Sequence, residues 1–122
     1  MVYDYCNRKL TYLIVVTGLP AFTEDHWKKI RIGGSVCHVS CRTTRCQLPN
    51  VDPETGIKDK QEPYQTLMET RGKVDEGASP SPCLGMQMVP LLKDSKGVER
   101  IAVGDAVEVL EVGDHYYVKL FP

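Results

Sequence analysis

The sequence predicts a mostly β fold, a barrel or a sandwich of short strands with one or two short helices. Short runs of β-branched and aromatic residues are separated by turn residues, and several of these runs alternate apolar and polar side chains. No internal repeat is visible. The length of 122 residues and the hydrophobic fraction of 42% are ordinary for a single globular domain, which argues against disorder throughout the chain.

Charge and hydropathy argue against two classes of protein. The 15 Lys and Arg residues against 16 Asp and Glu give a net charge of −1, so we expect no nucleic-acid partner, because binding to a phosphate backbone needs a basic face. The longest apolar run, residues 13–16, is far shorter than the roughly 20 residues that span a bilayer, so no transmembrane segment is expected. The first residues lack the pattern of a secretory signal, which predicts an intracellular protein.

The first third of the chain predicts a buried strand followed by a hairpin. Residues 10–17 are β-branched and aromatic and too short for a typical helix, so we expect a strand. A short turn capped by Thr23 then carries Trp27 inward. Two extended runs flank Gly33–Gly34, and adjacent glycines suit a tight hairpin turn because they can take positive φ angles.

The middle of the chain predicts a long loop, one helix and a connection. Residues 47–62 are polar, and residues 52–56 (Asp-Pro-Glu-Thr-Gly) form a strong turn sequence. Residues 63–71 begin with proline, place Tyr, Leu, Met and Arg on one face, and stop before a glycine, which predicts a helix. The Gly, Ser and Pro content of residues 75–82 predicts a surface connection and a candidate hinge.

The last third predicts short strands at residues 84–89, 101–103, 106–112 and 115–121. In the first of these, Met86 and Met88 share one face and are expected in the core. The apolar phase slips between Val109 and Leu110, which indicates a bulge or a strand buried on both faces.

Residues 37–56 hold the side chains best suited to chemistry: Cys37, His38, Cys41, Arg42, Arg45 and Cys46. An arginine beside a thiol favours the thiolate, which predicts a nucleophile or a soft-metal ligand, and arginine forks also suit a phosphate-bearing ligand. A second interpretation is zinc held by the three cysteines and the histidine, although their spacing matches no common zinc pair. The third is that the cysteines are small buried residues in a reducing cell.

A family resemblance narrows these alternatives. Residues 24–33, the segment 45–56 with its Arg-Cys followed by Val-Asp-Pro-Glu-Thr-Gly, and residues 103–110 resemble successive landmarks of the MOSC domain. That family includes the carboxy-terminal domain of molybdenum cofactor sulfurases and the mitochondrial amidoxime-reducing component. The resemblance implies a MOSC-type β-barrel, complete or not. Residues 1–122 would then be one MOSC domain, a carboxy-terminal portion without the family's amino-terminal β domain.

The same resemblance implies a site for a molybdopterin-type molybdenum cofactor. Carried over by position, Cys46 is the metal ligand and the catalytic residue. Arg45 and Thr44 would contact the pterin or the phosphate, and the turn at Asp52 would shape one wall of the pocket. The remaining cysteines are interpreted as structural, namely Cys6, Cys37 and Cys83, while the role of Cys41 stays open.

Three functions follow as hypotheses. The first is an oxidoreductase that reduces N-hydroxylated substrates by oxo transfer, with electrons from a redox partner protein, in the cytoplasm or the mitochondrion. The second is a sulfur carrier or cofactor-binding module served by a cysteine desulfurase, because this chain is too short to hold a pyridoxal-phosphate site. The third is a shortened, non-catalytic member, since residues 10–13 replace a Phe-Arg-Pro-Asn element of the reductase branch. An exposed sheet edge, or a homodimer that covers it, is expected.

Overall fold

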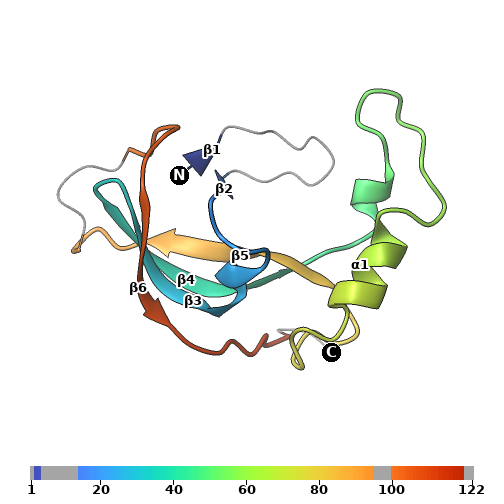
Figure 1. Cartoon of the computed structure of the whole chain (residues 1–122). Coiled ribbons are helices and arrows are strands. Elements are labelled where there is room, and N and C mark those ends of the chain that lie inside the picture. The colour runs from blue at the N-terminus through green and yellow to red at the C-terminus, as the bar shows by residue number, and fades with distance from the viewer. Residues whose placement is uncertain (1, 4–13, 95–99, 120–122) are drawn as a thin grey trace.

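The structure is a computed structural model that describes residues 2–3, 14–94 and 100–119. Its centre is a four-stranded antiparallel sheet with the strand order β5-β4-β3-β6 (Figure 1). The strands of this sheet are β3 (Trp27–Ile32), β4 (Ser35–Thr44), β5 (Cys83–Pro90) and β6 (Val107–Val112). A second, two-residue pair joins β1 (Val2–Tyr3) to β2 (Val15–Val16). The mostly β prediction is confirmed, with a sheet that is open rather than closed into a barrel within these ranges.

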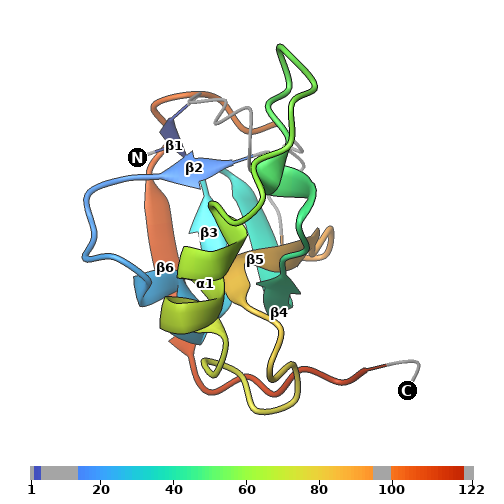
Figure 2. The ribbon, with the colours of Figure 1, turned by 90° about the vertical axis from the view of Figure 1, so that its right-hand side faces the viewer.

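Within the described residues, three short helices accompany the sheet: η1 (Thr23–His26), η2 (Leu48–Asn50) and α1 (Tyr64–Arg71). The predicted helix over residues 63–71 is confirmed, and its inward face ends in the buried Arg71. Figure 2 shows α1 in front of the sheet, where it contacts β5. None of the helices in the described ranges is long and apolar enough to cross a membrane.

The predicted hairpin supplies the buried residues of the core. Ile32 lies opposite Ser35 across the Gly33–Gly34 turn, and Gly33 adopts a φ of 56°, which a side chain would disfavour. The buried residues of this core come from β3 and β4: Trp27, Ile30, Ile32, Cys37 and Val39. Met86 and Met88 of β5 pack against them while partly buried, as their shared face predicted. The hairpin therefore holds the sheet together around Trp27.

A bulge at Ser40 changes which side chains of β4 point inward. Val39 lies opposite Met88, and Arg42 lies opposite Met86. Since Met86 and Met88 are two residues apart, they share a face of β5, and so Val39 and Arg42 share a face of β4 although they are three residues apart. The bulge thus turns the guanidinium of Arg42, rather than the thiol of Cys41, into the interior, where Arg42 is only 4% exposed.

The bulge predicted in the last strand is also present. Lys29 pairs with Glu111 and Ile30 with Val109, which leaves Leu110 as the extra residue of β6. Burial of β6 on both faces is not found, because Val109 and Val112 are exposed.

The prediction of a surface connection at residues 75–82 holds only in part. Glu76 and Pro80 are exposed, but the segment buries Asp75, Ala78 and Pro82, so it also forms part of the interior next to β5. Gly and Pro residues predicted exposure because they are typical of loops. Here the segment folds around the carboxylate of Asp75, which accepts hydrogen bonds from the backbone N–H groups of Gly77 and Tyr117. The contact with Tyr117 is long-range, so it leaves no signal in local composition.

Two further strand predictions differ from the structure. Residues 101–103 are exposed and form no strand. The described part of 115–121 pairs with no strand, and the side chains of Arg42 and Asp75 bind the backbone of His115 and Tyr117 there. Of the predicted strand at residues 10–17, the structure shows β2 alone, and residues 10–13 lie outside the described ranges, as does Cys6.

Candidate functional site

Cys46 is placed where β4 gives way to the loop over residues 47–62. Its side chain is exposed, and its Sγ accepts a hydrogen bond from the backbone N–H of Leu48 at 3.4 Å. Burial raises the pKa of the other three described thiols, at Cys37, Cys41 and Cys83, and the negative charge of Asp75 adds to this effect at the last two. Because its side chain is the exposed one, Cys46 is the thiol within the described ranges that is most open to an external soft metal.

The geometry of β4 argues against the zinc interpretation. Cys37 is buried, whereas His38, the next residue, is exposed on the opposite face of the strand. No cluster of three or more His, Cys, Asp or Glu side chains in the described part of the chain could hold a metal ion. The predicted set is therefore not assembled.

Thr44 and Arg45 connect Cys46 to the rest of the molecule. Thr44 ends β4 opposite Cys83. Arg45 donates twice to the start of β5 and the residues before it, from its backbone N–H to the carbonyl of Pro82 at 2.8 Å and from Nε to the carbonyl of Leu84 at 2.9 Å. The residue before the candidate ligand is thus fixed through both its backbone and its side chain.

Asp52 shapes the loop that follows. Its Oδ1 accepts the backbone N–H groups of Glu54 at 2.8 Å and Thr55 at 3.3 Å, and its carbonyl accepts the N–H of Gly56 at 2.8 Å. This is an Asx turn, and it lies where the sequence predicted a turn. One carboxylate oxygen is engaged in the turn, so Asp52 sets the shape of the loop that follows Cys46.

Asn50 anchors the same loop to α1, and sequence reasoning did not select it. Its Oδ1 accepts the N–H of Tyr64, the first residue of α1, at 2.9 Å, and its carbonyl accepts the N–H of Asp59 at 2.8 Å. The residue is only 2% exposed, and its Nδ2 finds no partner within the described residues. The available signal was its place beside Pro49, within the motif segment that begins with the Arg-Cys pair.

A buried ion pair lies behind the Cys46 strand, and sequence analysis missed it. Arg42 donates from one nitrogen to Asp75 Oδ2 at 2.9 Å and to the carbonyl of His115 at 3.0 Å. Asp75 Oδ1 accepts the N–H groups of Tyr117 at 2.8 Å and Gly77 at 3.1 Å. Local sequence carries no signal for an inward arginine, because Cys37, Val39 and Cys41 alternate with polar residues up to Arg42, and its acidic partner is 33 residues away in the chain.

The charge of Asp75 should make stability fall in acid. Burial raises the pKa of this carboxyl, but hydrogen bonds from two backbone N–H groups and from Arg42, together with the charge of Arg42, outweigh burial, so the pKa lies below its usual value. A carboxyl with a lowered folded pKa contributes stability that is complete above its unfolded pKa of about 4 and is lost as the pH falls through the folded value. We expect the urea midpoint to drop as the pH falls below about 5, and to drop less in Asp75→Asn. Equal slopes for the two proteins would contradict this assignment.

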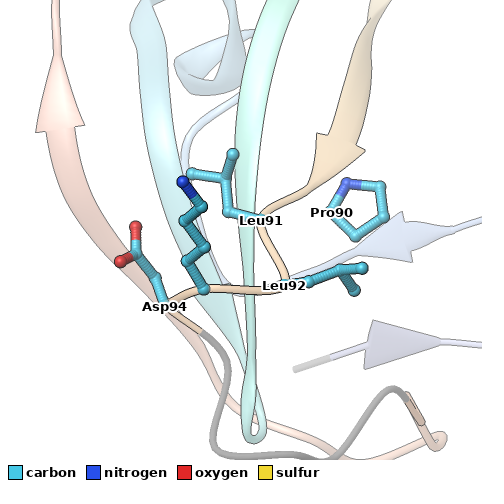
Figure 3. A pocket seen from close by; sticks show the side chains of 5 residues that line it. Pro90, Leu91, Leu92 and Asp94 are labelled. Atoms are coloured by element: carbon cyan, nitrogen blue, oxygen red, sulfur yellow. The ribbon is translucent and has the colours of Figure 1, made fainter.

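A shallow hollow lies at the other end of β5 and is separate from these residues. Its lining comprises Pro90, Leu91, Leu92, Lys93 and Asp94 (Figure 3). Pro90 lies opposite Cys37, whereas the Cys46 end of β4 lies opposite Cys83. Of its charged lining residues, Asp94 is paired with Lys29 at 3.1 Å.

Comparison with known proteins places these features in a family. The model of the MOSC domain matches residues 14–108. The mitochondrial amidoxime-reducing component 1 of Danio rerio is 43% identical over 72 residues, which cover 59% of this chain and 22% of that protein. Its counterpart in Mus musculus is 41% identical over 58 residues, 48% of this chain and 17% of that protein. The molybdenum cofactor sulfurase of Aspergillus niger is 44% identical over 61 residues, 47% of this chain and 7% of that protein.

These matches cover less than a quarter of the length of the relatives named. The family match itself covers most of this chain and includes β3, β4, the Cys46 loop, α1 and β5. The chain therefore belongs to the MOSC domain family.

Proposed function

We propose that this protein binds a molybdenum cofactor through Cys46 and takes part in the reduction of N-hydroxylated substrates. The observation that carries the proposal is the exposed thiol of Cys46 at the end of β4, next to a firmly held arginine. The relatives support it, because their names refer to amidoxime reduction and to the molybdenum cofactor.

The donor set suits such a group. Thiolate sulfur is a soft, electron-rich ligand appropriate to molybdenum, and the N–H of Leu48 is positioned to stabilise negative charge on that sulfur. The guanidinium of Arg45 and the hydroxyl of Thr44 would take oxygens of the pterin or its phosphate, and the Asp52 turn would bound the site on the loop side. When bound, the cofactor would supply the two-electron oxo-transfer chemistry.

The proposal extends to a partner and a compartment. Reduction needs an electron donor, and a separate redox protein would supply the electrons. The relatives named mitochondrial suggest the mitochondrion as the compartment to examine first. Localisation of a tagged full chain would identify the compartment.

Metal analysis tests the proposal directly. In protein purified from a host that makes the cofactor, we expect molybdenum in the wild type and a fall to background in Cys46→Ala, because the thiolate is the metal's protein ligand. Cys41→Ala is the matched control, since that thiol lies on the same strand but is half-buried, with a raised pKa. A wild type without molybdenum, or equal content in Cys46→Ala, would remove the proposal.

A sulfur-carrier role is the second candidate, favoured by the exposure of Cys46 and by the relative named molybdenum cofactor sulfurase. It differs from the first in what Cys46 carries. Incubation with a cysteine desulfurase and cysteine would leave a persulfide on Cys46, detectable by peptide mass spectrometry and absent from Cys46→Ala. A non-catalytic family member would show neither metal nor persulfide.

A further inference from the structure

We propose that Asp75 is a positioning residue for Cys46, acting through the segment from Asp75 to Leu84 that holds Arg45. The consequence for the cofactor rests on the proposed function, whereas the positioning itself is a property of the chain alone. Three links connect the buried carboxylate to the exposed thiol.

The first link is the fold of residues 75–82 around one carboxylate. The side chain of Asp75 is 0% exposed and accepts from Gly77 N, Tyr117 N and Arg42. Its carbonyl accepts the N–H groups of Ala78 at 3.1 Å and Ser79 at 2.9 Å. Both its side chain and its backbone therefore set the path of this segment, which lacks regular secondary structure of its own.

The second link runs from that segment to Arg45. The carbonyl of Pro82 accepts the backbone N–H of Arg45, and the carbonyl of Leu84 accepts its Nε. Between them, the carbonyl of Cys83 accepts Nε of Arg71 at 2.8 Å. The positions of the two carbonyl groups that bind Arg45, those of Pro82 and Leu84, thus depend on the path by which residues 75–82 lead into β5.

The third link is covalent, because Cys46 follows Arg45 directly. The sulfur contacts an N–H of its own loop, that of Leu48, whereas the bonds of Arg45, together with the pairing of Thr44 and Cys83, tie this end of β4 to β5 and the residues before it. If the sulfur of Cys46 shifted by even an ångström, it would bind the metal poorly, because the geometry of a site depends on the residues that support it.

Amide hydrogen exchange on the metal-free full chain tests the positioning. In Asp75→Asn, which keeps an acceptor but removes the charge, we expect the amide of Arg45 to exchange about tenfold faster than in the wild type. The amides of Ile30 and Val39 in the β3–β4 hairpin should change by less than about threefold. Asp105→Asn is the matched control, because that carboxylate also caps a backbone N–H, of Ala102 at 2.9 Å, but lies away from Arg45 in the chain and outside the 75–84 segment.

Two results would overturn the inference. One is an unchanged Arg45 amide, and the other is equal acceleration of Arg45 and the hairpin, which would show a contribution to global stability alone. If Asp75→Asn does not fold, Arg42→Lys replaces it, since the lysine keeps the positive charge and loses the guanidinium geometry. There too, faster exchange confined to Arg45 supports the inference, and its absence overturns it.

Molybdenum content separates this inference from the function on which its consequence rests. With both correct, Asp75→Asn from a cofactor-producing host holds several-fold less molybdenum than wild type while Asp105→Asn matches wild type. A wild type without metal whose Arg45 amide still responds to Asp75→Asn would end the proposed function and leave the positioning intact. Metal in the wild type with an unresponsive Arg45 amide would do the reverse.

Discussion

Replacing Arg71 with methionine is expected to lower the free energy of unfolding by about 3–5 kcal/mol, because it leaves a buried carboxylate without its partner. Arg71 is 6% exposed and donates from one terminal nitrogen to both oxygens of Asp25 at 2.7 Å. Its Nε also donates a hydrogen bond to the carbonyl of Cys83, and its guanidinium lies 4.1 Å from the centre of the Phe22 ring. One side chain therefore joins the end of α1 to η1 and to β5.

Urea unfolding followed by tryptophan fluorescence measures this loss, since Trp27 is the single tryptophan and is buried. Arg31→Met is the matched control, because Arg31 is paired with Glu108 at 2.7 Å in an exposed setting that contributes about 0–1 kcal/mol. Similar losses in the two variants would show that burial is not what makes the Arg71 pair strong. The double variant Asp25→Leu/Arg71→Met should recover much of the loss, because neither charge remains unpaired.

The second large effect is expected from Gly77→Ala, which should cost about 3 kcal/mol, at the upper end of the range for overpacking. A Cβ on Gly77 would overlap the carbonyl oxygen of Tyr117 and lie 2.8 Å from its carbonyl carbon. These are backbone atoms, so the carboxy-terminal segment would have to move. That movement would break the bond from the N–H of Tyr117 to Asp75.

The control for this variant is Gly113→Ala, where a Cβ would meet the flexible side chain of Lys28 at 3.3 Å. We expect that change to stay within about 0.5 kcal/mol. The urea midpoint of each variant gives the comparison. A Gly77→Ala protein as stable as Gly113→Ala would mean that residues 113–119 do not pack against the 75–82 segment as described.

The open edges of the sheet are candidate surfaces for interaction with other chains. β5 and β6 are the outer strands of the described sheet, and β6 exposes Val109 and Val112. The sequence-based expectation of an exposed edge is met, and whether a second copy covers it stays a prediction that size-exclusion chromatography can check.

Local sequence determined much of the fold because its signals act over a few residues. The Gly33–Gly34 turn, the helix that ends at Arg71, the Asx turn at Asp52 and the phase slip at Leu110 all depend on neighbours in the chain. The motif that carries the family resemblance, Arg45 followed by Cys46, is likewise a local feature of the sequence. The functional role of these residues stays a prediction until metal or persulfide is measured.

Tertiary structure alone decided what supports that motif. The bulge at Ser40 sends Arg42 inward, and the carboxylate that receives it comes from Asp75, in a segment whose composition predicts an exposed loop. The strand predicted at residues 115–121 is, as far as it is described, an unpaired segment bound to these same two residues. A buried charge needs a partner wherever the chain can supply one, and periodicity along the sequence carries no record of contacts between residues so far apart.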